Sequence, residues 1–169
     1  MMRKTLLLSL AIAMGAPLAA LPASSQAVPS KQTLSYGPAD LQKVEYWPGA
    51  SSHSPLVVFV HGGGWKRGDM TTMDGSSKLT DWHAHGYAVA SVDYRLVPQA
   101  TVEDEAADVA AATAYLHAHA ATLGFDPQRI VLVGHSAGAH LVALVGTDPK
   151  WLGDVGLKLR SEERRVGKE

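Results

Sequence analysis

A Gly-x-Ser-x-Gly segment at Gly134–Gly138 constrains this 169-residue chain more than any other feature. The apolar run Ile130–Val133 precedes it and the helix-forming stretch Ala137–Val145 follows it, which predicts a turn from a buried strand into a helix. A turn this tight strains the backbone of its central residue. The residues two before and two after that residue crowd each other, which explains glycine at both positions. We therefore expect the Ser136 hydroxyl to stand above the sheet at a helix N-terminus, where backbone N–H groups stabilise developing negative charge.

An anion-binding turn is the alternative interpretation of this segment. A phosphate-binding loop requires the pattern Gly-x-x-x-x-Gly-Lys-Ser/Thr, and no lysine follows Gly138. The position of the serine between a strand and a helix instead favours a nucleophile.

A second glycine-rich segment, His61-Gly62-Gly63-Gly64-Trp65, follows the apolar run Leu56–Val60. Three consecutive glycines cost conformational entropy, so we infer a loop whose N–H groups turn toward an oxyanion. The candidate donors are the backbone N–H groups of Gly63, Gly64 and Ala137. His61 is interpreted as a hydrogen-bonding residue that orders the loop, and Trp65 as a pocket wall or core residue. A flexible loop is the alternative.

Alternation of strands and helices predicts an α/β fold with a mostly parallel sheet and helices on both faces. After a polar lead-in at Val28–Ser35, the expected strands are Leu41–Trp47, Leu56–Val60, Tyr87–Val92 and Ile130–Val133, and the expected helices are Lys78–His85, Thr101–Thr122 and Ala137–Val145. All strands except the first are predicted to be buried. Thr101 and Asp104 resemble a capping box, and Glu103, Glu105 and Asp108 add acidic groups near the positive end of the same helix. In such sheets chemistry takes place at the carboxyl ends of the strands, where both glycine-rich segments fall.

Both ends of the chain differ from the domain between them. Residues 1–27 have a basic start, an apolar run and small residues ending at Ala27, which predicts a signal peptide and a secreted or periplasmic protein. The apolar run is short for a membrane anchor, so we expect no stable anchor. Residues 160–169 carry 7 charged side chains in 10, which is typical of a solvated tail. The string also resembles a translated sequencing adapter, so we interpret 160–169 as a non-native tail and 28–159 as a partial domain.

Composition excludes several kinds of chemistry. The chain has no cysteine, which rules out disulfides, thiolate metal sites and a cysteine nucleophile. Its net charge of −1 provides no basic footprint for nucleic acid. The pairs His83/His85 and His117/His119 are spaced i, i+2, which places them on different helix faces and predicts surface or interface histidines. We expect no metal and no cofactor; the oligomeric state is not predicted.

Four segments together resemble the α/β-hydrolase carboxylesterases, near the feruloyl-esterase-like and kynurenine-formamidase-like groups. They are His61–Trp65, Asp93–Pro98 (DYRLVP), Gly134–Leu141 (GHSAGAHL) and Thr147–Leu152 (TDPKWL). The resemblance covers about residues 36–152. It implies Ser136 as nucleophile, with Gly63, Gly64 and Ala137 as the oxyanion hole and no cofactor. It also implies that a carboxylic acid and a histidine base follow Ser136 in the chain.

The sequence departs from this pattern after Ser136. The one histidine that follows, His140, lies a full turn into the elbow helix and cannot reach the hydroxyl as a base. Asp148 and Asp154 come too early for the acid. We therefore expect the N-terminal part of an α/β-hydrolase fold, incomplete, with acid and base outside this sequence.

The expected function is an exported serine hydrolase that cleaves small or aryl esters through an acyl-serine intermediate. The partner is thus a small-molecule ester. The alternatives are an aryl-formamide hydrolase, a non-catalytic binding protein of the same fold, and an inactive fragment. Within this picture, Asp93, Tyr94 and Arg95 are predicted to hold the glycine loop by hydrogen bonds and an ion pair.

Overall fold

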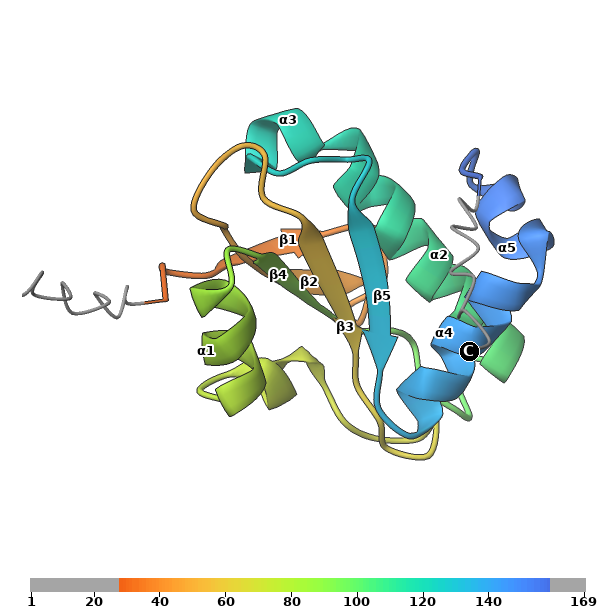
Figure 1. Ribbon diagram of the computed structural model, residues 1–169. Helices are drawn as coiled ribbons and strands as arrows, with labels where there is room; N and C mark the ends of the chain where they lie inside the picture. Colours follow the sequence, from red (N-terminus) through yellow and green to blue (C-terminus); the bar gives the residue numbers. More distant parts are fainter. Residues whose placement is uncertain (1–27, 159–169) are drawn as a thin grey trace, which may run out of the picture.

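The computed structural model describes residues 28–158, which form one mixed five-stranded sheet flanked by helices (Figure 1). The strands are β1 (Gln32–Ser35), β2 (Lys43–Trp47), β3 (Leu56–Val60), β4 (Ala88–Val92) and β5 (Ile130–Gly134), in the order β1-β2-β4-β3-β5. β3 pairs in parallel with β4 and β5, whereas β2 is antiparallel to both of its neighbours. Four of these strands therefore point one way and β2 points the other. The expected α/β class with a mostly parallel sheet is confirmed.

Helices cover both faces of the sheet, as expected (Figure 1). α1 (Ser77–Ala84) and the short 3-10 helix η1 (Met70–Met73) lie on one face; α2 (Val102–Ala118) and α4 (Ala137–Thr147) lie on the other. The short helices α3 (Ala120–Leu123) and α5 (Pro149–Asp154) extend the second layer. None of the helices among residues 28–158 is long and apolar enough to cross a membrane.

Two layers of side chains form the core. On the α1 face, Trp47, Phe59 and Val89 pack with Met73 and Leu79. On the α2 face, two larger clusters fill the space between sheet and helices, centred on the buried valines and alanines of β2, β3, β4, α2 and α4. Such β-branched and small residues fit closely packed strands and helices.

Local sequence explains where α1 and α2 begin and end. The Ser76 hydroxyl accepts a hydrogen bond from the Leu79 N–H at the start of α1, and Gly86 follows the helix with φ +83°. At the start of α2, Thr101 and Asp104 form the expected capping box, each side chain accepting a hydrogen bond from the other's backbone N–H.

Three expectations about the elements are wrong. The polar lead-in contains a strand, β1, which forms because its backbone pairs with β2 from Gln32–Tyr46 to Ser35–Lys43. The long helix expected at Thr101–Thr122 ends at Ala118, and a separate turn, α3, follows before Gly124 closes it at φ +78°. β5 is not a buried strand, because it is the edge of the sheet among the described residues and Val131 is 49% exposed.

The two terminal segments cannot be compared with the structure. The predicted signal peptide at 1–27 and the predicted tail at 160–169 lie outside the described residues.

Candidate active site

Ser136 occupies a strained turn between β5 and α4. Its backbone lies at φ +53° and ψ −118°, a conformation that favours glycine, yet the residue is serine. Its side chain is exposed to solvent. The strained backbone of Ser136 costs free energy that the rest of the fold must offset, and strained residues of this kind are frequent at functional sites.

The two glycines of the turn are required by close backbone contacts. A Cβ on Gly134 would collide with the carbonyl of Gly138 and lie 2.5 Å from the Ala139 nitrogen. A Cβ on Gly138 would collide with the carbonyls of Val60 and His61. The predicted crowding of the two glycines is thus present, and Gly138 additionally seats α4 against the end of β3.

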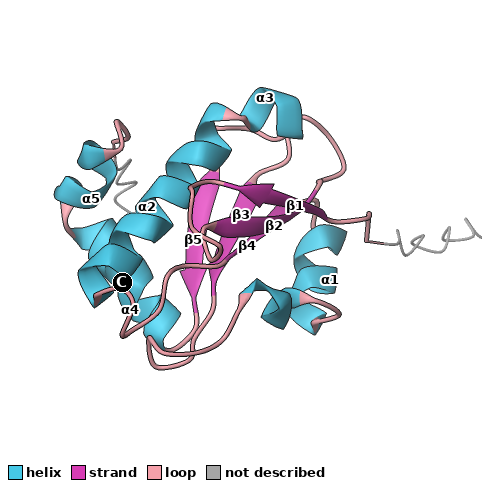
Figure 2. Ribbon diagram, turned by 180° about the vertical axis from the view of Figure 1, so that it is seen from behind, coloured by secondary structure: helices cyan, strands magenta, loops and turns pink. Residues whose placement is uncertain are grey.

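The glycine loop, His61–Trp65, lies directly beside this turn. A Cβ on Gly62 would lie 2.8 Å from the His135 carbonyl oxygen and 3.1 Å from the Ser136 Cβ. The loops that follow β3 and β5 run side by side at the carboxyl ends of these parallel strands (Figure 2). The structure therefore brings together the two glycine-rich segments that the sequence singles out.

The backbone of the glycine loop is left-handed along much of its length. Gly63, Gly64 and Trp65 have φ values of +137°, +64° and +62°. A side chain at Gly63 would also collide with the Arg67 carbonyl. Glycine is thus needed at position 63 on two independent grounds.

The segment after β4 fixes both ends of the glycine loop. The Tyr94 hydroxyl donates to the His61 carbonyl at 2.8 Å, and the Tyr94 ring stacks on the His61 ring with centroids 4.4 Å apart. The Val97 N–H donates to the Trp65 carbonyl, also at 2.8 Å. These contacts order a loop that its glycines would otherwise leave flexible.

His61 is buried and acts within the loop. Its Nδ1 donates to the Gly62 carbonyl at 2.8 Å, which leaves Nε2 as an acceptor 3.7 Å from the Asp93 carboxylate. Burial lowers the pKa of His61, although the Gly62 carbonyl acts in the opposite direction. A neutral, buried ring of this kind orders the loop, and it has no hydrogen bond to Ser136.

Asp93 directly follows β4 and binds the start of η1. Its Oδ1 accepts from the Met70 N–H at 2.5 Å. Burial raises the pKa of Asp93 to about 6, while the Met70 hydrogen bond acts to lower it. Asp93 thus connects the start of η1 with the end of β4.

Arg95 forms an ion pair, but with Asp108 of α2 and not with the glycine loop as expected. Arg95 Nη2 and Nε donate to the two Asp108 oxygens at 2.8 and 2.9 Å, and the Arg95 backbone N–H donates as well. Gln42 Nε2 supplies a fourth hydrogen bond to the same buried carboxylate. Four donors compensate the burial of this charge, which anchors the segment after β4 to α2.

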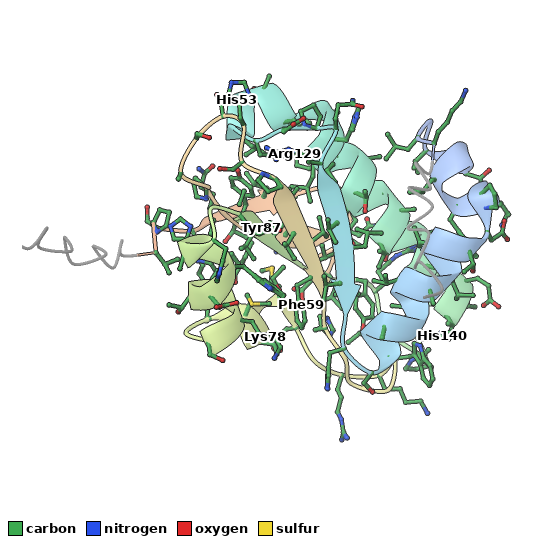
Figure 3. The ribbon with its side chains drawn as sticks, viewed as in Figure 1. His53, Phe59, Lys78, Tyr87, Arg129 and His140 are labelled. Atoms are coloured by element: carbon green, nitrogen blue, oxygen red, sulfur yellow. The ribbon has the colours of Figure 1, made fainter. Side chains whose placement is uncertain are left out.

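No acid–base partner for the serine lies within the described residues. Between 28 and 158, the Ser136 hydroxyl has no hydrogen bond to a histidine or a carboxylate. His140 is exposed at the start of α4 (Figure 3) and contacts Trp65 edge-on, with ring centroids 5.5 Å apart. This position is the one expected for His140.

One of the remaining histidines departs from the expectation. His83 is only 8% exposed, because α1 turns this side chain toward the sheet, so it is not a surface residue. His85 is exposed and binds the Asp81 carbonyl, and His119 stacks on Tyr115. The part of the chain that the structure describes contains no group of three or more His, Asp or Glu side chains placed to hold a metal.

An open groove of about 370 Å³ lies away from the serine, between α1 and the exposed face of β5. Its walls are mostly apolar and are formed by Val57, Asp81, Trp82, His85, Tyr87, Val131 and Val133. Tyr87 and the α1 side of the sheet are visible in Figure 3. This groove adjoins the edge strand and not the glycine loop.

Comparison with known proteins identifies the family. The BD-FAE family model matches residues 36–157, which covers both glycine-rich segments and the segment between them. The chain belongs to the BD-FAE family of α/β-hydrolase carboxylesterases.

Carboxylesterases also appear among the proteins to which this BD-FAE chain is similar. It is 40% identical over 111 residues to carboxylic ester hydrolase LipN and 38% identical over 119 residues to carboxylesterase NlhH, both of Mycobacterium tuberculosis. These alignments cover 64% and 68% of this chain but 29% and 36% of the relatives. The chain thus spans about a third of the length of these curated relatives.

Solved esterases share the fold of this BD-FAE domain. Esterase B of Lactobacillus rhamnosis matches with a TM-score of 0.65 and 26% identity, covering 78% of this chain and 44% of that one. Thermogutta terrifontis esterase 2, phosphonylated by sarin, matches with a TM-score of 0.65 and 28% identity, covering 76% and 49%. The expected family and fold are confirmed, and these relatives carry the names of ester hydrolases.

Sequence reasoning misses two side chains near the site. From the sequence, Asp108 is only an acidic residue near the positive end of a helix. Its ion pair with Arg95, 13 residues earlier in the chain, is not predicted. The sequence places Glu105 in the same way, yet Glu105 is completely buried. Their i, i+3 spacing on the face that carries Val109 is the available signal.

Proposed function

We propose that Ser136 is the nucleophile of an exported serine esterase that acts on small or aryl esters. The observation that supports it is the strained, exposed Ser136 beside the glycine loop. Ser136 Oγ attacks the ester carbonyl carbon, and the carbonyl oxygen becomes an oxyanion held by the N–H groups of Gly63, Gly64 and Ala137. Collapse of this intermediate expels the alcohol and leaves an acyl-serine.

The second half of the reaction returns the enzyme to its starting state. Water attacks the acyl carbon, the same N–H groups hold the second oxyanion, and the carboxylic acid leaves as Ser136 Oγ regains its proton. In the first half a base takes the Ser136 proton and gives it to the leaving alcohol, and in the second half the same base takes a proton from the attacking water and gives it to Ser136 Oγ. We propose that this base, a histidine, and its acid partner come from polypeptide beyond the present sequence, since the aligned segments make up only 29% and 36% of the two relatives.

Backbone geometry makes the glycine loop suited to hold an oxyanion. Residues 63 to 65 have positive φ values, so their N–H groups do not alternate from side to side as those of a strand do. Hydrogen bonds from Tyr94 and Val97 hold the two ends of the loop in place. Ala137 is the first residue of α4, where the N–H has no partner within the helix. A rigid set of donors costs no reorganisation when charge develops.

Export follows from the leader-like residues 1–27 and is proposed on the sequence alone. A cleaved leader would leave a mature protein that starts near residue 28. N-terminal sequencing of the protein recovered from the medium or periplasm tests this: a start at Val28 supports export, and an intact Met1 in the cytoplasm contradicts it.

Hydrolysis of p-nitrophenyl acetate and butyrate tests the proposed activity. The 169-residue chain is expected to show no turnover. The extended protein, in which the downstream coding sequence of the gene follows residue 159 in place of 160–169, is expected to hydrolyse both esters. Ser136→Ala in the extended protein lowers kcat at least about a thousandfold. Robust turnover by the 169-residue chain, or turnover that survives Ser136→Ala, contradicts the proposal. Activity on formanilide that exceeds activity on phenyl acetate would assign the enzyme to aryl formamides.

A further inference from the structure

Glu105 is a buried carboxyl group that the proposed mechanism does not use. It lies in the first turns of α2 and is 0% exposed. Neither of its side-chain oxygens has a hydrogen bond within the described residues. An ionised carboxylate without partners is costly to bury, so this group must either be neutral or gain a donor.

The backbone N–H of Val97 is a donor that acts on this carboxyl. It lies close enough to the Glu105 carboxyl to lower its pKa, but burial has the larger effect and raises that pKa to about 7. The Val97 N–H is already used, because it donates to the Trp65 carbonyl at 2.8 Å. One backbone donor thus lies between two acceptors, the buried carboxyl and the end of the glycine loop.

Other charged groups around Glu105 are accounted for. Asp108, one turn further along α2, acts to raise the pKa of Glu105, but Arg95 compensates the charge of Asp108. Tyr94 lies on the segment after β4. Burial raises the pKa of Tyr94, and the charge of Glu105 acts in the same direction.

Groups on the neighbouring helices face elsewhere. In α4, His140 is exposed against Trp65. In α5, Lys150 and Asp154 line a separate outer groove with Glu103 and Asp104. None of these described groups donates a hydrogen bond to Glu105.

We propose that Glu105 is a positioning residue whose ionisation loosens the Trp65 end of the glycine loop. When the carboxyl is neutral, the Val97 N–H remains on the Trp65 carbonyl and the loop is held at both ends. When the carboxyl loses its proton to solvent, the carboxylate draws the Val97 N–H to itself and the Trp65 carbonyl is released. Gly63 and Gly64 then lose their fixed orientation.

The consequence for catalysis rests on the proposed function. If Gly63 and Gly64 hold the oxyanion, a loosened loop lowers kcat and leaves KM nearly unchanged, since the oxyanion forms only after substrate binds. Activity should therefore fall as the pH rises through the pKa of Glu105.

Hydrogen exchange followed by mass spectrometry tests the loop directly, without substrate. We compare the 169-residue wild type at micromolar concentration with Glu105→Gln, which keeps the shape and removes the charge. Glu103→Gln, an exposed carboxyl two residues away, is the matched control. Protection factors, corrected for intrinsic exchange, are measured for peptides that contain Gly63, Gly64 and Trp65, because the Val97 N–H has an acceptor in both states.

In the wild type, protection of these peptides should fall at least about fivefold between about pH 6 and pH 8. Glu105→Gln should show no such fall, and Glu103→Gln should behave like the wild type. A fall of the same size in Glu105→Gln, or no fall in the wild type, overturns the proposal. If Glu105→Gln does not fold, Glu105→Met is used instead, because methionine has a similar volume and no charge. Glu105→Met should likewise show no fall in protection with pH.

The two proposals fail in different ways. A pH-dependent fall that depends on Glu105, together with an extended protein whose activity survives Ser136→Ala, refutes the nucleophile and leaves the loop contact intact. An active, Ser136-dependent enzyme whose exchange is independent of Glu105 refutes the role of Glu105 alone. In the extended enzyme, Glu105→Gln should also remove the alkaline fall in kcat without changing KM.

Discussion

The hydroxyl of Tyr94 donates a 2.8 Å hydrogen bond to the backbone carbonyl of His61, and the two rings stack with centroids 4.4 Å apart. Tyr94 follows β4 and His61 follows β3, so this contact ties together the ends of two parallel neighbouring strands. It fixes the first residue of the glycine loop at the point where the chain leaves the sheet. The segment Asp93–Pro98 (DYRLVP) thus holds the glycine loop His61–Trp65 in place.

Removal of the Tyr94 hydroxyl tests this support. Tyr94→Phe leaves the buried His61 carbonyl without its donor, so the free energy of unfolding should fall by about 1 to 3 kcal/mol. Urea denaturation followed by circular dichroism measures it. Tyr115→Phe is the control, because the Tyr115 ring stacks on His119 and its hydroxyl has no hydrogen bond among the described residues. An equal effect of both substitutions would contradict the specific role of Tyr94.

Two glycines of α4 should respond to alanine in opposite directions. A Cβ on Gly138 collides with the carbonyls of Val60 and His61, so Gly138→Ala should destabilise the domain by about 2 kcal/mol or more. A Cβ on Gly146, in the same helix, would meet no atom within 4 Å, so Gly146→Ala should stabilise by about 0.5 to 1 kcal/mol. Thermal unfolding of both variants decides this; a stable Gly138→Ala would show that the elbow helix does not depend on this contact.

Backbone strain at Ser136 predicts a gain in stability when the residue is replaced by glycine. At φ +53° and ψ −118°, glycine is unstrained and serine is not, so Ser136→Gly should raise the free energy of unfolding by about 1 kcal/mol or more. Ser136→Ala retains a Cβ and should leave it nearly unchanged. If both variants are as stable as the wild type, the turn is not strained and its functional interpretation loses support.

Much of this site follows from local sequence. Gly134, Ser136 and Gly138 predict the turn because the crowding of Gly134 against Gly138 involves residues within five positions of one another, whereas the contact of Gly138 with the end of β3 does not. The same holds for the capping box of Thr101 and Asp104. Where a structure depends on its own few residues, a sequence pattern is enough to predict it.

Other features depend on distant residues and were not predictable. β1 has few apolar residues and becomes a strand by pairing with β2. The spacing of Glu105 within α2 indicates the inner face of the helix, but its complete burial depends on the segment after β4 that packs there, which the helix pattern does not contain. The exposed position of β5 depends on which strands lie beside it, whereas its apolar sequence predicts a fully buried strand.

Stability should depend on pH through Glu105. Its pKa is raised from an ordinary 4.5 to about 7, so folding favours the protonated form. The stabilisation is complete below about pH 4.5 and is lost as the pH rises through about 7. Glu105→Gln stays neutral, so its free energy of unfolding relative to wild type should rise by about 2 to 3 kcal/mol between about pH 5 and pH 8.

The difference between the two proteins isolates Glu105. Asp93, with its pKa raised to about 6, and His61, with its lowered pKa, titrate in both proteins and cancel. Urea denaturation at a series of pH values provides the comparison. A difference that stays constant across this range would show that Glu105 does not titrate there.

The nucleophile itself is tested most directly by covalent labelling. The extended protein is treated with a fluorophosphonate, digested and analysed by mass spectrometry. We predict one phosphonyl group, on the peptide that contains Ser136, and no label in Ser136→Ala. A label on another residue, or one that persists in Ser136→Ala, would contradict the assignment of this serine.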